Sequence, residues 1–256
     1  MIAGLPMYER PELFQAHDNL WQLIHKQIDG SPQKLSRNVE LWDLWTSPEL
    51  LLAQTCSSPY RESLFKNTIY VGTPDYKLPN CPPGYYNSII IGQSGLSFSQ
   101  LKTGIFGYND KFSHSGWTAP INHFQKLDIC PKKTKKTGSH RSSAQAVADG
   151  QIDFAAIDAQ SWRFIKKYDK FANKIKVFDQ TEPTPGLPFI TSKPGLKDKL
   201  FFAIKRAIQA LSDQDRSLLY LKDLILNLLL APKKVFMLLS ASGVTKTILL
   251  EVFSAN

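Results

Sequence analysis

The hydrophobic pattern of the chain alternates between helical spacing and short continuous apolar runs. The clearest amphipathic helix is predicted over residues 11–28, with Pro11 in its first turn. Its apolar face is formed by Leu13, Leu20, Trp21, Ile24 and Ile28. The apolar run at residues 50–53 instead predicts a strand buried on both faces.

Further strands and helices are predicted in alternation along the rest of the chain. Besides a strand at the very start, the remaining strands are predicted at residues 68–72, 88–92, 103–108, 154–157, 175–178 and 189–191. Helices are predicted at residues 39–45, 58–65, 116–127, 142–149, 159–171 and 196–211. Strands that alternate with helices predict an α/β architecture with parallel sheets.

Two proline-rich stretches, residues 72–84 and 181–188, are typical of connectors between lobes. If both cross between lobes, the segment between them is an inserted lobe. We therefore expect a discontinuous first lobe of residues 1–80 and 185–256, and an inserted second lobe of residues 81–184. Two lobes with a cleft between them can close on a ligand by a hinge motion.

The two ends of the chain bear on localisation. The first residues have neither a basic region nor a long apolar stretch, so they do not form a signal peptide. Near the other end, charged residues interrupt the apolar segment 218–239 before it reaches the roughly 18 residues of a spanning helix. Residues 218–230 are apolar on every face, which predicts a buried helix packed on the first lobe or, alternatively, a partner interface.

The composition is that of an ordinary folded protein with a basic excess. The 256 residues carry 31 Lys and Arg against 22 Asp and Glu, a net charge of +9. Such an excess fits nucleic acid, an anionic membrane, an anionic small ligand or solubility alone. The lysine-rich run 132–136 lacks interleaved aromatic residues, which favours a solvated loop over a nucleic-acid interface. Three cysteines without zinc-ligand spacing predict no metal site, and no cofactor motif is found.

Residues 104–117 read as a strand, a turn and the start of a helix. Ser113 or Ser115 fits the N-cap of that helix, where hydroxyls and free backbone amides also suit an external anion. Gly116 lacks a Cβ and would let a ligand approach the backbone. From spacing alone, a simple helix cap and an anion cradle are equally supported.

Two further residues are candidates because of their positions. His140 lies at a helix entrance and suits an anion donor, although such a residue is more often a local cap. Asp158 ends a buried strand, where ligands of open α/β sheets bind, and equally suits the N-cap of the following helix. In an enzyme, His140 would be the obvious acid or base.

Several short segments, taken together in order over residues 5–191, carry a resemblance to a known family. They are residues 5–12, 54–56, 71–76 with Cys81, 113–116, 138–140, 157–158 and 185–189. In this combination the sequence resembles the phosphonate and phosphite solute-binding proteins of ABC importers. The resemblance implies an α/β, two-lobe, type II periplasmic-binding-protein fold with the ligand in the cleft between the lobes.

The resemblance also implies a ligand site. Its residues are Ser113, Ser115, Gly116 and Trp117 as a cradle for the phosphorus group, Tyr8 from the other lobe, His140 as a donor, Asp158, and Thr55 and Tyr76 on the first lobe. An ionised carboxylate only accepts hydrogen bonds, so Asp158 beside an anion requires a proton or an ammonium group on the ligand. This requirement favours a protonated phosphonate over sulfate.

The function implied is non-catalytic binding of a phosphonate, phosphite or phosphate for delivery to an ABC permease. The alternative is a small-molecule enzyme or a sensor on the same fold. We expect a periplasmic or extracellular protein if a leader was removed, and a cytoplasmic one if the sequence is complete. In an exported protein Cys56 and Cys81 could form a disulfide, with Cys130 left free.

Overall fold

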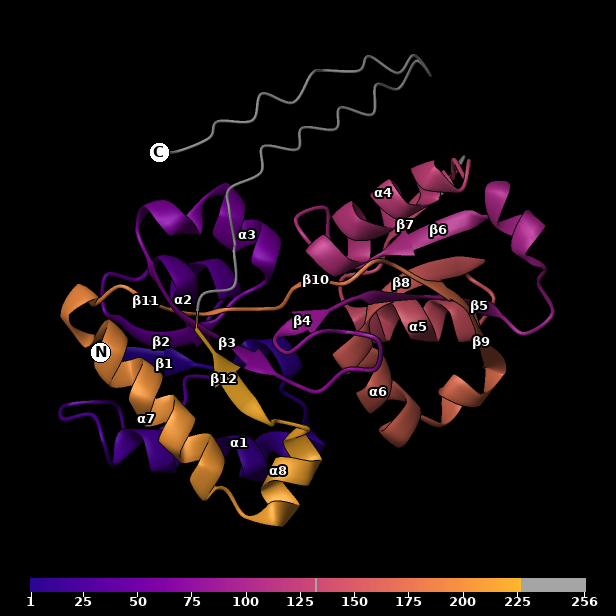
Figure 1. The fold of residues 1–256 in the computed structure, drawn as a ribbon. Helices are drawn as coiled ribbons and strands as arrows, with labels where there is room; N and C mark the ends of the chain where they lie inside the picture. Colours follow the sequence, from indigo (N-terminus) through magenta and orange to yellow (C-terminus); the bar gives the residue numbers. More distant parts are fainter. Residues whose placement is uncertain (132, 227–256) are drawn as a thin grey trace.

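The computed structural model describes residues 1–131 and 133–226 (Figure 1). Over these residues the chain forms two five-stranded sheets, each flanked by helices, and a two-stranded ribbon between them. The predicted α/β class is confirmed. The predicted parallel sheets are wrong in part, because both sheets are mixed.

The first sheet has the strand order β1-β2-β11-β3-β12. Its strands are β1 (Ile2–Gly4), β2 (Leu50–Gln54), β11 (Phe189–Thr191), β3 (Ile69–Asp75) and β12 (Asp223–Ile225). Strands β1 and β2 are parallel, whereas β11 runs antiparallel between β2 and β3. Its helices are α1 (Phe14–His25), α2 (Leu41–Thr46), α3 (Ser57–Glu62), α7 (Lys197–Ala210) and α8 (Asp213–Leu219). Strand β11 follows the crossing that returns from the second sheet, and it runs antiparallel to both of its neighbours.

The second sheet has the strand order β7-β6-β8-β5-β9. Its strands are β7 (Lys133–Lys136), β6 (Ile105–Tyr108), β8 (Phe154–Asp158), β5 (Ser88–Gln93) and β9 (Ile175–Gln180). Strands β7, β6 and β8 are parallel, and β5 is antiparallel to both β8 and β9. Its helices are α4 (Ala119–Lys126), α5 (His140–Ala148) and α6 (Ala159–Tyr168).

The two crossings between the sheets are hydrogen-bonded to each other. Strand β4 (Tyr85–Tyr86) on the outward crossing pairs antiparallel with β10 (Thr184–Pro185) on the return. Beside this ribbon, a Cβ on Gly186 would lie 2.7 Å from the carbonyl oxygen of Gly84, so glycine permits the close approach. The strands of the two sheets come from residues 2–75 with 189–225 and from residues 88–180. The lobe boundaries at 80/81 and 184/185 remain a prediction.

Three local predictions differ from the structure. Residues 133–136 are not a loop: they form the exposed edge strand β7, paired in register with β6, while Lys132 lies outside the described residues. The helix expected from residue 218 ends at Leu219, because Tyr220 adopts a left-handed backbone with φ of 52° and β12 follows. The rest of that predicted helix, residues 227–230, lies outside the described part. The connector expected from residue 72 begins later, since β3 continues to Asp75.

The three cysteines are free thiols, so the structure contains no bridge between Cys56 and Cys81. Among the described residues, no helix is long and apolar enough to cross a lipid bilayer. The same part of the chain contains no cluster of three His, Cys, Asp or Glu side chains suited to a metal ion.

An aromatic triad holds α4 against the second sheet. Phe106 of β6 and Phe154 of β8 have ring centroids 5.3 Å apart, and Phe124 of α4 lies 5.3 Å from Phe106 and 5.7 Å from Phe154. All three side chains are essentially excluded from solvent. Because α4 continues the turn that carries the predicted cradle, this triad positions that cradle on the sheet.

Truncation of the triad should therefore destabilise the protein strongly. Phe154→Ala leaves a cavity in the buried triad, and we expect it to lower the free energy of unfolding by about 4 kcal/mol. The measurement is urea unfolding followed by circular dichroism. Phe65→Ala, at an exposed phenylalanine, is the control and should cost less than about 0.5 kcal/mol. Equal losses in the two variants would contradict this role of the triad.

Candidate functional site

A hydrogen bond between Tyr8 and Asp158 joins the two halves of the molecule. Tyr8 ends a short 3-10 turn (Pro6–Tyr8) after β1, and Asp158 ends β8 in the second sheet. The Tyr8 hydroxyl donates to Asp158 Oδ2 at 2.9 Å, and both residues are buried. Asp158 Oδ1 accepts the Ser161 backbone amide at 2.9 Å, which caps α6. Asp158 is therefore a helix cap and an interlobe contact at once.

Burial changes the acidity of this pair. Removal from water raises the pKa of Asp158 to about 6, and the hydrogen bonds from Ser161 and Tyr8 lower it only partly. Burial, together with the neighbouring Asp158 carboxylate, raises the pKa of Tyr8 well above its ordinary value, so the phenol stays protonated. Asp158 thus titrates just below neutral pH, in a place closed to bulk water.

The predicted cradle lies on a π-helical turn (His114–Thr118) that leads into α4. Ser113 caps this turn, since its Oγ accepts the Gly116 backbone amide at 3.0 Å. Ser115 Oγ lies 3.0 Å from Nε2 of His140, the first residue of α5. Burial lowers the pKa of His140 to about 4, so the ring is neutral at physiological pH. Two helix starts and a neutral Ser–His pair therefore meet at one edge of the second sheet.

The space beside Gly116 is occupied by Asn109. A Cβ on Gly116 would overlap Asn109 Oδ1, so the glycine makes room for this carboxamide rather than for open solvent. Asn109 Oδ1 is buried and has no hydrogen-bond partner among the described residues. A buried polar atom without a partner is costly, and its carboxamide offers either oxygen or nitrogen to a ligand. The sequence signal for Asn109 was its place directly after β6, beyond the carboxyl end of the strand.

His114 was also overlooked as an interlobe contact. Its Nδ1 lies 2.9 Å from Arg61 Nη2 and 3.3 Å from Ser58 Oγ, both on α3, and its Nε2 lies 3.1 Å from Thr184 Oγ1. Burial and the adjacent Arg61 lower the pKa of His114 to about 3, so this ring is neutral. Nδ1 therefore accepts from Arg61, and Nε2–H donates to Thr184. The contact ties the cradle turn to α3 and to the return crossing.

The remaining predicted residues surround these groups. Thr55, directly after β2, is fully buried, and its backbone amide donates to the Pro188 carbonyl at 3.0 Å. The Tyr76 ring lies edge-on to Tyr8 with centroids 5.0 Å apart, and its hydroxyl accepts from Gln54 Nε2 at 3.1 Å. The Trp117 ring packs on Tyr108, 4.6 Å between centroids, so it faces the core of the second sheet.

The comparisons with known proteins are consistent in family and fold. Residues 77–227, more than half of the chain, match the family model described as ABC transporter, phosphonate, periplasmic substrate-binding protein. The chain belongs to this family. A comparison with the curated proteins gives no significant match. The family expected from the sequence is thus confirmed.

Solved structures show the same fold for this phosphonate-family protein. A binding-protein component of an ABC phosphonate transporter from Pseudomonas aeruginosa is 19% identical, with a TM-score of 0.67 over 88% of this chain and 80% of that one. PhnD1 from Prochlorococcus marinus in complex with methylphosphonate is 17% identical, with a TM-score of 0.69 over 88% and 91%. MatC from Rhodopseudomonas palustris with bound malate is 10% identical, with a TM-score of 0.57 over 85% and 86%. The two-lobe type II periplasmic-binding-protein fold is therefore confirmed.

The structure brings the predicted residues of this phosphonate-family protein into three groups. Tyr8, Asp158 and Tyr76 form one, Ser115 and His140 another, and Ser113 and Gly116 the third. Thr55 and Trp117 join none of these groups through a side-chain hydrogen bond. As a set of ligand contacts, all nine residues remain a prediction.

The raised pKa of Asp158 has a consequence for stability. Folding favours the protonated carboxyl, so its contribution is fully present below the unfolded-state pKa near 4 and is lost as pH rises through about 6. Asp158→Asn removes this titration but keeps a cap for α6. We expect the stability of the parent protein relative to Asp158→Asn to fall by about 2 kcal/mol between pH 4 and pH 7.

Urea unfolding at a series of pH values measures this difference. Asp128→Asn, which changes a fully exposed carboxylate, is the control and should show a constant difference from the parent protein. A constant difference for Asp158→Asn as well would contradict the buried titration.

Proposed function

We propose that the protein binds a small phosphorus oxyanion, without chemical change, between its two lobes and delivers it to an ABC permease. The lobes are taken as residues 1–80 with 185–256 and residues 81–184. The family of the chain supports the permease partner and a periplasmic location. The observation that carries the proposal is that Ser115, His140 and Asp158 lie at or after the ends of three neighbouring parallel strands, β6, β7 and β8. From the first sheet, Tyr8 donates to Asp158, and Ser115 lies 3.0 Å from His140.

The proposed cradle recognises an anion mainly with neutral donors. Ser113, Ser115 and the free amides at the start of the turn suit phosphoryl oxygens, since helix N-termini carry partial positive charge. Neutral His140 donates from one ring nitrogen. Arg61 carries the full positive charge in this region, and its guanidinium lies 2.9 Å from Nδ1 of the neutral His114 on the cradle turn.

Asp158 supplies the selectivity for phosphorus. A carboxylate next to an anion is repulsive unless one proton lies between them, either on Asp158 or on the ligand. Phosphonate, phosphite and phosphate keep a proton near neutral pH, whereas sulfate does not. Tyr8 and Tyr76 then close the site from the first sheet, with their rings against each other.

The first test is calorimetry with methylphosphonate, aminoethylphosphonate, phosphite, phosphate and sulfate. We expect at least one phosphorus anion to bind and sulfate to bind far more weakly. Ser115→Asp places a carboxylate in the cradle, and the affinity should fall by at least about a hundredfold. Ser99→Asp introduces the same charge at an exposed serine and should bind like the parent protein.

Two results would contradict this function. One is undiminished binding in Ser115→Asp, and the other is the absence of binding for every phosphorus anion. Release of phosphate from an organic phosphonate by the purified protein would instead favour an enzyme.

The second test is the pH dependence of affinity. Above pH 7, where Asp158 and the bound phosphonate would both be ionised, binding must take up a proton, because the raised pKa of Asp158 is about 6. The dissociation constant of the parent protein should therefore rise up to about tenfold per pH unit. In Asp158→Asn the amide donates directly to the dianion, and the slope should be shallower.

Calorimetry in buffers of different ionisation enthalpy counts the proton taken up. Asp128→Asn should keep the parent slope, since this fully exposed side chain contacts Lys102 and is not one of the predicted site residues. Equal slopes for the parent and Asp158→Asn would remove Asp158 from the ligand site.

A further inference from the structure

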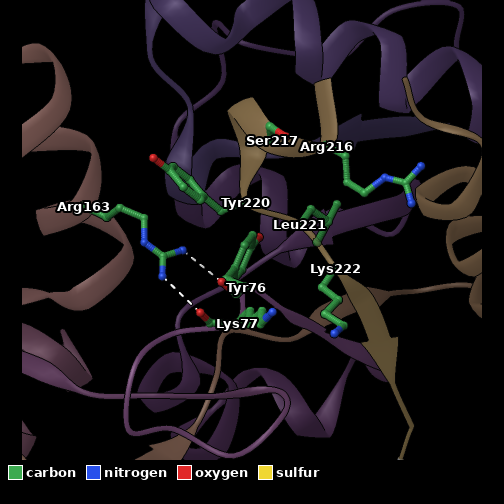
Figure 2. A pocket seen from close by; sticks show the side chains of 8 residues that line it. All are labelled: Tyr76, Lys77, Arg163, Arg216, Ser217, Tyr220, Leu221 and Lys222. Carbon is green, nitrogen blue, oxygen red and sulfur yellow. Dashed lines mark hydrogen bonds between the residues drawn. The ribbon is translucent and has the colours of Figure 1, made fainter. Parts of the chain in front are cut away.

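A pocket of about 440 Å³ lies between α6 and the segment that joins α8 to β12 (Figure 2). Its lining is Tyr76, Lys77, Arg163, Arg216, Ser217, Tyr220, Leu221 and Lys222. It shares only Tyr76 with the predicted phosphonate site. Its volume is within the range of small-molecule sites, about 300–1,000 Å³. Arg163 comes from α6, which packs on the second sheet. The other lining residues belong to the first sheet's side of the molecule, in α8, the segment before β12 and the start of the outward crossing.

The lining contains four cationic side chains and no acidic one. Arg163 donates to the backbone carbonyls of Tyr76 and Lys77 at 2.9 and 3.1 Å, and to the Gln160 side-chain oxygen at 3.0 Å. These partners are neutral, so they orient the guanidinium without compensating its charge. Burial accordingly lowers the pKa of Arg163.

Two other arginines of the molecule, outside the pocket, each pair with two carboxylates. Arg10 pairs with Glu12 and Asp169, and Arg37 pairs with Glu9 and Asp18, each within 3.1 Å. In the pocket, by contrast, the shortest approach of a carboxylate to Arg216 is 3.7 Å, from exposed Asp213. Within the described residues, neither Lys77 nor Lys222 makes a side-chain ion pair. Among the described residues, Lys77, Arg163 and Lys222 therefore have no carboxylate partner. Arg216 has only the 3.7 Å pair with an exposed aspartate.

The aromatic side of the pocket is already occupied by cations. The Arg163 guanidinium lies 4.4 Å from the centroid of the Tyr220 ring, and Lys167 Nζ lies 5.5 Å from it. Lys77 and Tyr220 both adopt left-handed backbone conformations, with φ of 46° and 52°. The pocket wall is thus held in a defined shape, with cations rather than an open ring surface facing the space.

We propose that this pocket is a second anion site, separate from the phosphonate cleft, for a small polyanion with at least two negative charges. Like charges gathered around one pocket repel one another, and a bound polyanion removes that repulsion. Because Arg163 and the lysines belong to different halves of the molecule, the ligand would also hold α6 against Lys77 and Lys222. Condensed phosphates and tricarboxylates share the required chemistry.

The test is calorimetry with pyrophosphate and, separately, with citrate, each with and without excess methylphosphonate. The parent protein should bind at least one of the two at a single site. Lys77→Gln/Lys222→Gln should lower that affinity at least about tenfold, because it removes two uncompensated lysines from the lining. Lys26→Gln/Lys34→Gln makes the same change in net charge at exposed lysines outside the pocket and should bind like the parent.

The same titrations on Ser115→Asp separate the two sites. Retained polyanion binding in this variant, with loss in Lys77→Gln/Lys222→Gln, supports the pocket whether or not any phosphonate binds. Three results would overturn it: binding of neither polyanion, equal affinity in the two lysine double variants, or loss of polyanion binding in Ser115→Asp. If Ser115→Asp does not fold, the parent protein provides the test. Displacement of the polyanion by excess methylphosphonate would then show that the two ligands share one site and would overturn the proposal.

Discussion

The structure depends on a carboxylate that is kept away from water. Asp158 stands at the end of β8, a central strand of the second sheet, and its two oxygens face two different partners. One oxygen starts α6, and the other reaches Tyr8 at the edge of the first sheet. A buried carboxylate without these partners would be strongly unfavourable. One side chain therefore links the start of α6 to the contact between the two halves.

Much of this arrangement follows from local patterns in the sequence. The buried runs at β2 and β8 and the amphipathic helices α1 and α7 lie where the sequence pattern predicts them. The two strands are buried along their whole length, and each helix buries one face throughout. Strand direction was not predictable in the same way. Whether β11 runs parallel or antiparallel to β2 depends on a crossing from the other half of the chain, which no local pattern encodes.

The departures at the site have similar causes. The sequence places Asn109 directly after a predicted strand. Its contact with Gly116 could not be predicted, because it depends on how the chain turns between the two residues. His114 reads as a helix residue, whereas its partners Arg61 and Thr184 lie 53 and 70 positions away. Tyr220 ends α8 in a left-handed conformation although the surrounding apolar residues favour a longer helix. In each case a tertiary contact or a single backbone conformation outweighs the local tendency.

The net charge of +9 does not show where on the molecule the positive charge lies or what it does there. Neutral hydroxyl, imidazole and carboxamide groups line the proposed phosphonate cradle, while uncompensated cations line the pocket beside α6. Many of the remaining lysines are simply exposed. Net charge therefore describes how the surface attracts anions over distance, and the local donors determine which anion stays.

The edge strand β7 gives the lysines a further role. Its residues Lys133–Lys136 are exposed, and no strand of the described residues pairs with its outer side. Such an edge is a template for pairing with another chain, and repeated lysines oppose that pairing through charge repulsion and their strong hydration. The lysines of β7 thereby protect a binding protein from edge-to-edge aggregation at high concentration.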